Sequence, residues 1–191
     1  MVKQLVLILF ALIQFSAGAQ EQRAGILKFN LGLSQGFMLK YDSRPFFADG
    51  FVEYFPNDQI SIKGSCNQII ADRTEPMLLK QYTGISFGAF RHFAKGMSDF
   101  SIGVQPGVVL EKPGIVYENY SPDLQVTPSL MFTVQYTLFF SGLFHFYLAA
   151  SENTSYFRGA PDGHINTSWI SFTGGLGWHL RTRNNEHGKM K

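Results

Sequence analysis

The chain has 191 residues, a length that suits one domain. Its 16 Lys and Arg residues nearly balance its 14 Asp and Glu residues, so the charge gives no reason to expect a nucleic acid or a strongly acidic partner. Aromatic residues make up 15% of the chain and 19 residues are glycine, yet the mean hydropathy is only -0.01. No segment reaches the roughly 20 apolar residues of a membrane helix. The apolar residues must therefore be dispersed, as they are in strands of period two.

Residues 1–19 have the features of a secretory signal peptide. The basic Lys3 precedes an apolar run from Leu5 to Phe15, and the small residues at 17–19 favour cleavage after Ala19. The run is too short to cross a bilayer as a helix, although a retained N-terminal anchor is the alternative. Cleavage would remove Lys3 and leave 15 basic against 14 acidic residues.

Residues 25–41 alternate, with Leu31 and Leu33 on one parity and Gly32 and Ser34 on the other. This pattern predicts a strand with one apolar face and one small or polar face. It recurs along the chain, and no segment has the pattern of a helix. Residues 45–55 give the weakest signal, because phenylalanines occupy both parities. The eight predicted strands are 25–41, 45–55, 60–71, 80–93, 98–110, 124–140, 143–153 and 168–181.

The connections between these strands differ in length. Those after the second, fourth and sixth strands are short, whereas those after the third, fifth and seventh are longer and polar. This arrangement predicts an all-β fold: an eight-stranded antiparallel up-and-down transmembrane β-barrel with short periplasmic turns and longer extracellular loops. Closure of such a barrel pairs every backbone group, as hydrocarbon requires. Pro106 falls inside a predicted strand, where a local bulge would accommodate it.

Alternation alone does not tell which face of the barrel is inside. An apolar face inside would make the chain a secreted, soluble, lipocalin-like barrel that binds an apolar ligand. We favour lipid outside, because the opposite face is rich in Gly, Ser and Thr, which fit a narrow interior. Aromatic residues at the strand ends predict two girdles at the membrane interfaces. They are Tyr54, Phe93, Phe100, Phe140, Phe144 and Trp178 near the turns, and Tyr41, Tyr82, Tyr120, Tyr156 and Trp169 near the loops.

The stretch "SFTGGLGWHL" resembles the last strand of bacterial outer-membrane proteins, with Thr173 and Gly175 on one parity and Trp178 and Leu180 on the other. Together with "VEYFPNDQISIKG", the signal peptide and the eight strands, it makes the mature chain similar to the small outer-membrane β-barrel family related to OmpA and OmpX, of the Bacteroidota type.

This resemblance implies a location in the outer membrane of a Gram-negative bacterium, in contact with outer-membrane lipid. It also implies that the barrel assembly machinery reads the last strand through Thr173, Gly175, Trp178 and Leu180. The barrel would occupy residues 20–181. The polar tail, 182–191, departs from the family pattern, and we expect it to be disordered.

Candidate catalytic and metal-binding residues are few. None of the five histidines has a partner at metal-ligand spacing, and no phosphate-binding loop or nucleophile elbow occurs, so we expect no metal, no cofactor and no catalytic residue. The alternative is a barrel enzyme acting on lipid, but no histidine begins the His-x-Ser pattern of the deacylase type. Loop residues Glu152, Ser155, Asp162 and His164 could be arranged as a triad. The single Cys66 excludes an intramolecular disulfide.

Three charged residues, Lys28, Glu53 and Lys63, fall on the small-residue face toward the turn ends of successive strands. If the hairpin pairs Glu53 with Lys63, the three form a cluster inside the barrel. Such a cluster is a plug that holds the register or, alternatively, a proton or ion path. We therefore expect a monomeric, non-enzymatic membrane barrel without a large pore, whose extracellular loops have a structural or surface-binding role toward an unidentified ligand.

Overall fold

A computed structural model describes residues 23–73, 78–114, 122–160 and 163–182. The predicted signal peptide and residues 183–191 of the tail lie outside this range and stay predictions. Within it, no helix is long and apolar enough to cross a membrane. The strands are β1 (Ile26–Met38), β2 (Pro45–Tyr54), β3 (Ile60–Asp72), β4 (Leu79–Lys95), β5 (Ser98–Pro113), β6 (Gln125–Phe139), β7 (Phe144–Ala160), β8 (Gly163–Asn166) and β9 (Trp169–Arg181).

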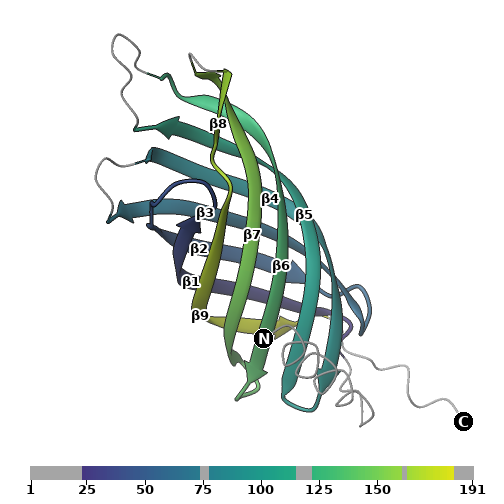
Figure 1. Cartoon of the computed structure of the whole chain (residues 1–191). Coiled ribbons are helices and arrows are strands. Elements are labelled where there is room, and N and C mark those ends of the chain that lie inside the picture. The colour runs from purple at the N-terminus through teal and green to yellow at the C-terminus, as the bar shows by residue number, and fades with distance from the viewer. Residues whose placement is uncertain (1–22, 74–77, 115–121, 161–162, 183–191) are drawn as a thin grey trace, which may run out of the picture.

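These strands form one closed antiparallel barrel (Figure 1). Neighbours in the chain pair from β1 to β7, and β9 pairs with both β7 and β1, which closes the ring. The short β8 pairs with the end of β7 and leads directly into β9, so β8 and β9 share the eighth position. The predicted eight-stranded up-and-down barrel is confirmed.

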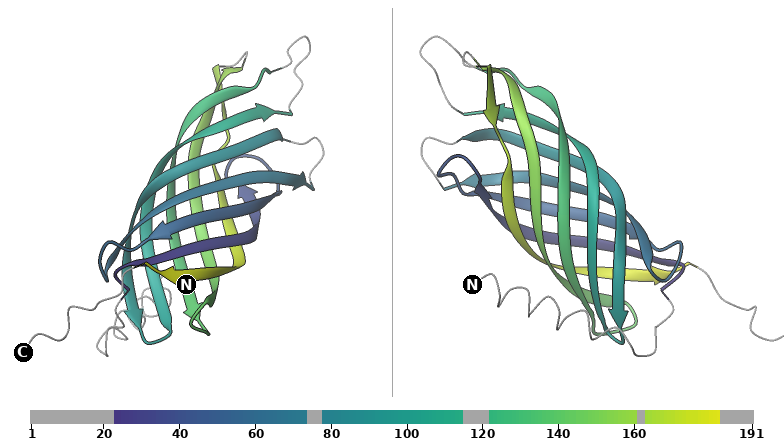
Figure 2. Two further views of the ribbon diagram at one scale, coloured as in Figure 1. Left: turned by 180° about the vertical axis from the view of Figure 1, so that it is seen from behind. Right: turned by 45° about the vertical axis from the view of Figure 1, so that its right-hand side comes forward.

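The strands are inclined to the barrel axis, as Figure 2 shows from two sides. A path from partner to partner around the barrel returns to β1 ten positions beyond its start (37 minus 27), which is a shear of ten. With ordinary strand spacings, this shear gives a tilt of about 40°. Ten residues then rise by about 25 Å, the height of the apolar band of an outer-membrane barrel. The path runs through Leu27, Tyr54, Ile62, Ala89, Val104, Phe132, Glu152, Ile170 and Phe37.

The apolar face of the barrel points outward. Leu31 is 63% exposed on β1 and Phe132 is 47% exposed on β6, whereas Lys28, Thr133 and Gln135 on the opposite parity are buried inside. A lipocalin-like barrel needs the reverse orientation, so that alternative is wrong. The prediction of an apolar outer face is confirmed.

The connections define two ends of the barrel. At the turn end lie the short connections 55–59, 96–97 and 140–143. At the loop end, β7 continues to Ala160 and forms a hairpin with β8. The connection predicted to follow residue 153 is therefore shorter than expected, because residues 154–160 and 163–166 pair as strands.

Five of the six aromatic residues predicted for the turn end form an outward girdle there, and the sixth, Phe100, is half-buried beside the Phe93 ring. The side chains of the five are between 40% and 56% exposed: Tyr54, Phe93, Phe140, Phe144 and Trp178.

The loop-end girdle is only partly correct. Tyr156 faces outward, Tyr41 is half-buried and packs against the apolar cluster at the loop end, and Tyr120 lies outside the described residues. Tyr82 and Trp169, however, are each only 1% exposed inside the barrel. Their parity turns them inward, where they pack with Phe47; the ring centroids of Phe47 and Trp169 lie 5.0 Å apart. These residues form an aromatic plug of the loop end. Inward phenylalanines such as Phe47 and Phe51 also explain the weak alternation of residues 45–55.

Small residues leave a depression in the outer face over β2 and β3. Gly50 and Gly64 lie between Leu31 and Phe87 in an apolar groove of about 500 Å³. The single cysteine, Cys66, also lines this groove and is exposed. The outer surface thus stays apolar over β2 and β3 but is hollowed there.

Pro106 lies in β5 without the expected bulge. Ser86 pairs with Gly107 and Ala89 with Val104, so the register between β4 and β5 is unchanged across the proline. The pairing of β4 with β5 is interrupted beside Pro106, but no extra residue is inserted into either strand there. The two backbones approach closely here, because a Cβ added to Gly88 would overlap the carbonyl oxygen of Val104 and lie 2.7 Å from the Cα of Gln105.

We predict that Gly88→Ala destabilises the barrel by about 1–3 kcal/mol, the usual cost of overpacking, because the added methyl group meets backbone that cannot move aside. Gly142→Ala is the matched control, since a Cβ there has no atom within 4 Å. The free energies of unfolding are measured in urea with the protein in detergent micelles. Equal stabilities of the two variants would contradict the close approach.

Candidate functional site

Six buried side chains form a polar network inside the turn end of the barrel. They come from the segment before β1 and from β1, β2, β3, β4 and β5, and each is at most 3% exposed. We call this set the turn-end network: Arg23, Lys28, Glu53, Ser61, His92 and Asp99.

The network is held by ion pairs between strands. Lys28 Nζ lies 3.1 Å from Glu53 Oε2 and 3.6 Å from Asp99 Oδ2. Arg23 Nη1 reaches the same Asp99 Oδ2 at 3.4 Å, and its guanidinium lies over the Phe139 ring. Burial of two cations is tolerated here because two carboxylates and aromatic faces replace the water that they lose.

Of the three residues predicted to cluster, the structure brings Lys28 and Glu53 into contact. Glu53 and Lys63 are register partners on β2 and β3, but the Lys63 amine donates instead to Gln135 Oε1, 2.7 Å away across the barrel. Lys63 also lies 3.7 Å from the centre of the Phe51 ring. Gln135 and the Phe51 ring are neutral, so Glu53 and Asp49 remain the anions that act on Lys63, without direct contact.

Three members of the network have the spacing of a catalytic triad. Ser61 Oγ lies 2.7 Å from His92 Nε2, and His92 Nδ1 lies 3.0 Å from Asp99 Oδ2. Ser–His–Asp arrangements of this geometry activate a serine for nucleophilic attack when the serine donates its proton to the histidine.

The surroundings of Ser61 oppose that chemistry. Ser61 Oγ is 2.6 Å from Glu53 Oε1, and the contact of Glu53 with Lys28 favours its ionised form, which can only accept. The single proton of Ser61 therefore goes to Glu53. His92 then has acceptors at both ring nitrogens and donates from both. Ser61 is also fully buried, so this arrangement is a clamp between strands rather than an activated nucleophile.

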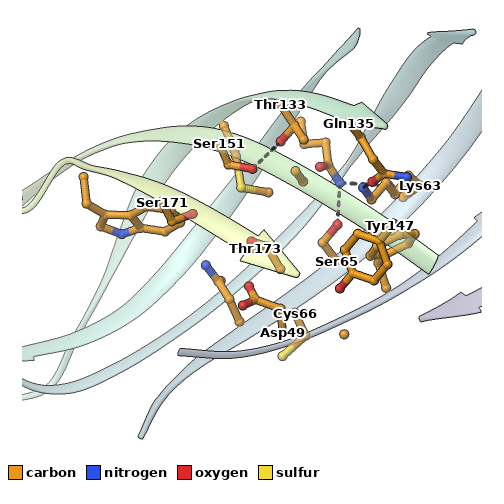
Figure 3. A pocket seen from close by; sticks show the side chains of 17 residues that line it. Asp49, Lys63, Ser65, Cys66, Thr133, Gln135, Tyr147, Ser151, Ser171 and Thr173 are labelled. Carbon is orange, nitrogen blue, oxygen red and sulfur yellow. Dashed lines mark hydrogen bonds between the residues drawn. The ribbon is translucent and has the colours of Figure 1, made fainter. Parts of the chain in front are cut away.

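Above the network, the lumen is nearly filled. Figure 3 shows the side chains that line a cavity in the lumen, with hydrogen bonds from Lys63 to Gln135 and between Thr133 and Ser151. Its volume is about 40 Å³, room for about three water molecules. Trp169 of the aromatic plug lines it on the side of the loop end, and Lys63 and Gln135 line it on the side of the turn end.

Two histidines far apart in the sequence meet at the turn end. His145 Nδ1 on β7 lies 3.2 Å from His179 Nδ1 on β9, and His145 Nε2 lies 2.6 Å from Asn30 Oδ1. Sequence spacing missed this contact because it depends on which strands pair. Within the described ranges, no group of three or more His, Cys, Asp or Glu side chains is arranged to hold a metal ion.

The residues considered for a loop triad do not converge. Glu152 and Ser155 are on opposite faces of β7, with Glu152 exposed outside and Ser155 buried inside. His164 lies on β8, and its ring packs against Tyr156. Asp162 lies outside the described residues.

The last strand, β9, carries the four residues assigned to an assembly signal. Trp178 and Leu180 are 41% and 48% exposed on the outer face, and Trp178 stacks on Phe29 of β1. Thr173 and Gly175 face inward, where Gly175 allows the close approach of the Tyr147 ring. Between Thr173 and Gly177 the strand therefore presents only small side chains to the lumen, whereas the bulky inward residues Trp169 and His179 lie toward its two ends.

A closed barrel with an apolar outer face and a filled polar lumen defines a transmembrane β-barrel. No family model matches the sequence, and no curated protein matches it. Solved structures show the same fold. The outer membrane protein OprG of Pseudomonas aeruginosa is 10% identical over 85% of this chain and 99% of its own, with a TM-score of 0.57.

Two other structures are similar at the same level. Ail, the attachment invasion locus protein of Yersinia pestis, is 15% identical over 82% of this chain and 99% of its own, with a TM-score of 0.53. The N-terminal β-barrel domain of Pseudomonas aeruginosa OprF is 15% identical over 82% of this chain and 98% of its own, also with a TM-score of 0.53. The chain thus has the fold of the small outer-membrane barrels.

We predict that Glu53→Gln destabilises the barrel by about 3–5 kcal/mol, because it leaves Lys28 buried without its nearest anion. Adding Lys28→Met should restore part of this loss, since both charges are then gone. Urea unfolding in micelles gives the coupling energy of the pair. The exposed pair Arg44–Asp42, with 61% and 90% exposed side chains, is the control and should couple by at most about 1 kcal/mol. Additive losses for Lys28 and Glu53 would show that the pair is not coupled.

Proposed function

We propose that the protein is an integral outer-membrane β-barrel with a non-enzymatic role, structural or in surface binding through its loop end. The observation that carries this proposal is the outward apolar belt on a closed barrel. Leu31, Phe87 and Leu176 are each more than 60% exposed, a degree of exposure that water does not favour and lipid does.

The orientation follows from the two ends. The short turns and their aromatic girdle would lie at the periplasmic interface, and the loop end would face the outside of the cell. OprG is described as an outer membrane protein and Ail as an attachment invasion locus protein. Their shared fold supports the location, and the name of Ail is consistent with a surface role.

A hydrolytic function is the weaker candidate. The triad-like geometry of Ser61, His92 and Asp99 is closed off from both ends of the lumen, and Ser61 donates to Glu53. A pore function is likewise disfavoured by the 40 Å³ cavity, by the aromatic plug and by the turn-end network.

We predict that the expressed protein fractionates with the outer membrane and migrates differently on a gel before and after boiling, as a folded barrel does. In planar bilayers it should give no large, stable conductance, because eight strands leave a lumen that side chains fill. Recovery in the soluble periplasmic fraction would contradict the membrane location. A steady porin-sized current would contradict the filled lumen.

We further propose that the end of β9 is read during assembly. Trp178→Ala combined with Leu180→Ala should leave the protein unassembled, because both side chains stand on the outer face at the strand end. The matched control is Phe172→Ala with Leu176→Ala, which removes outward side chains of similar exposure from the middle of the same strand.

The measurement is the amount of heat-modifiable, membrane-inserted protein. The control variant should insert, and deletion of residues 183–191 should change little. Normal insertion of the Trp178 and Leu180 variant, or failure of the tail deletion alone, would contradict a signal at the end of β9.

A further inference from the structure

A groove of about 390 Å³ opens at the turn end of the barrel, beside the turn-end network. It lies between the segment that precedes β1, the turn from β6 to β7, and the end of β9. Two arginines, Arg23 and Arg181, line it together with His179, and its apolar lining residues include Ile26, Phe139 and Phe140. Among the described residues, no acidic side chain lines it. The groove therefore combines positive charge with an apolar wall.

Arg23 forms a fixed floor of the groove, with its charge paired to the buried Asp99. Its Nη1 pairs with Asp99, while Nη2 donates to the carbonyl oxygens of Gly96 and Ser98 at 3.3 and 3.4 Å. The side chain is only 2% exposed, and its Nε is buried without a hydrogen-bond partner among the described residues. A buried N–H of this kind is costly unless an acceptor reaches it.

The opposite wall is also held in place. The contact between the Nδ1 atoms of His179 and His145 fixes the His179 ring against β7. Arg181 lies two residues further along β9 on the same face. His179 and Arg181 thus lie at the end of a paired strand, and strand pairing fixes their positions.

The position of the groove identifies the kind of anion. Phe140 lines the groove and is also 56% exposed in the turn-end aromatic girdle, at the level of lipid headgroups. A free inorganic anion would gain nothing from this apolar wall, whereas an amphiphile would use both parts. Basic pockets at this level of a membrane protein bind lipid headgroups.

We propose that this groove binds the phosphate of a glycerophospholipid from the leaflet at the turn end. The phosphate lies toward Arg23 and Arg181, and the acyl chains follow the outer surface past Phe140. This inference rests on the proposed membrane location, so insertion is tested first, by heat modifiability of the full mature chain in micelles.

The binding experiment uses native mass spectrometry of the folded protein with added phosphatidylglycerol. We expect one retained lipid per barrel and retention about tenfold weaker in Arg181→Gln, with Arg181→Lys close to the unchanged protein. Arg91→Gln is the matched control, because Arg91 is an exposed cation on the outer face of β4 and does not line the groove. It should retain lipid normally. His179→Gln is the second groove variant if Arg181→Gln does not fold.

Two further arms separate the lipid from other anions. Phosphatidylcholine should be retained more weakly, since its choline neutralises the phosphate charge, and millimolar inorganic phosphate should not displace phosphatidylglycerol. Displacement by inorganic phosphate would make this a free-anion site and overturn the proposal. Equal losses in Arg181→Gln and Arg91→Gln would also overturn it. A chain that does not insert at all would contradict the membrane location instead.

Discussion

The structure depends on the pairing of β1 with β9. In hydrocarbon, each unpaired backbone N–H or C=O costs several kcal/mol, so a sheet with two free edges is not stable there. The two strands pair over their full length, from Ile26 with Arg181 to Met38 with Trp169. This closure fixes the shear, and the shear fixes both the tilt of the strands and the width of the lumen. The contents of the lumen follow from that width.

Because the apolar residues of the alternating pattern face outward, the narrow lumen must be filled by the remaining, inward-facing side chains. The chain solves this in two ways along the axis. At the loop end, phenylalanine, tyrosine and tryptophan side chains such as Phe47 and Trp169 pack as they would in a soluble core. At the turn end, ions such as Lys28 and Glu53 neutralise each other. The second solution gives little net stability but specifies which strands stand together, because a slipped register would leave charges unpaired.

The sequence predicted the strands and their faces well, for a physical reason. Alternation reports whether a side chain meets lipid or lumen, and it did so correctly from Leu31 on β1 to Phe132 on β6. It does not report what stands opposite across the lumen. Lys63 therefore contacts Gln135 rather than Glu53, and Tyr82 joins an internal plug rather than a girdle. Arg23 precedes the first strand and belongs to no pattern. His92 and Asp99 could have been found, since both face inward beside one short turn.

The outward position of Cys66 has a consequence for its redox chemistry. A lone thiol in an exported protein is ordinarily open to oxidation and mixed disulfides, because the compartment is oxidising. Water-soluble oxidants and thiols react with such a thiol only where they can reach it. Cys66 sits beside Gly50 and Ile85 on the outer face, so the acyl chains that would cover it also keep it reduced. Cys66 has a large exposed area, yet the surrounding lipid would protect it without any covering side chains.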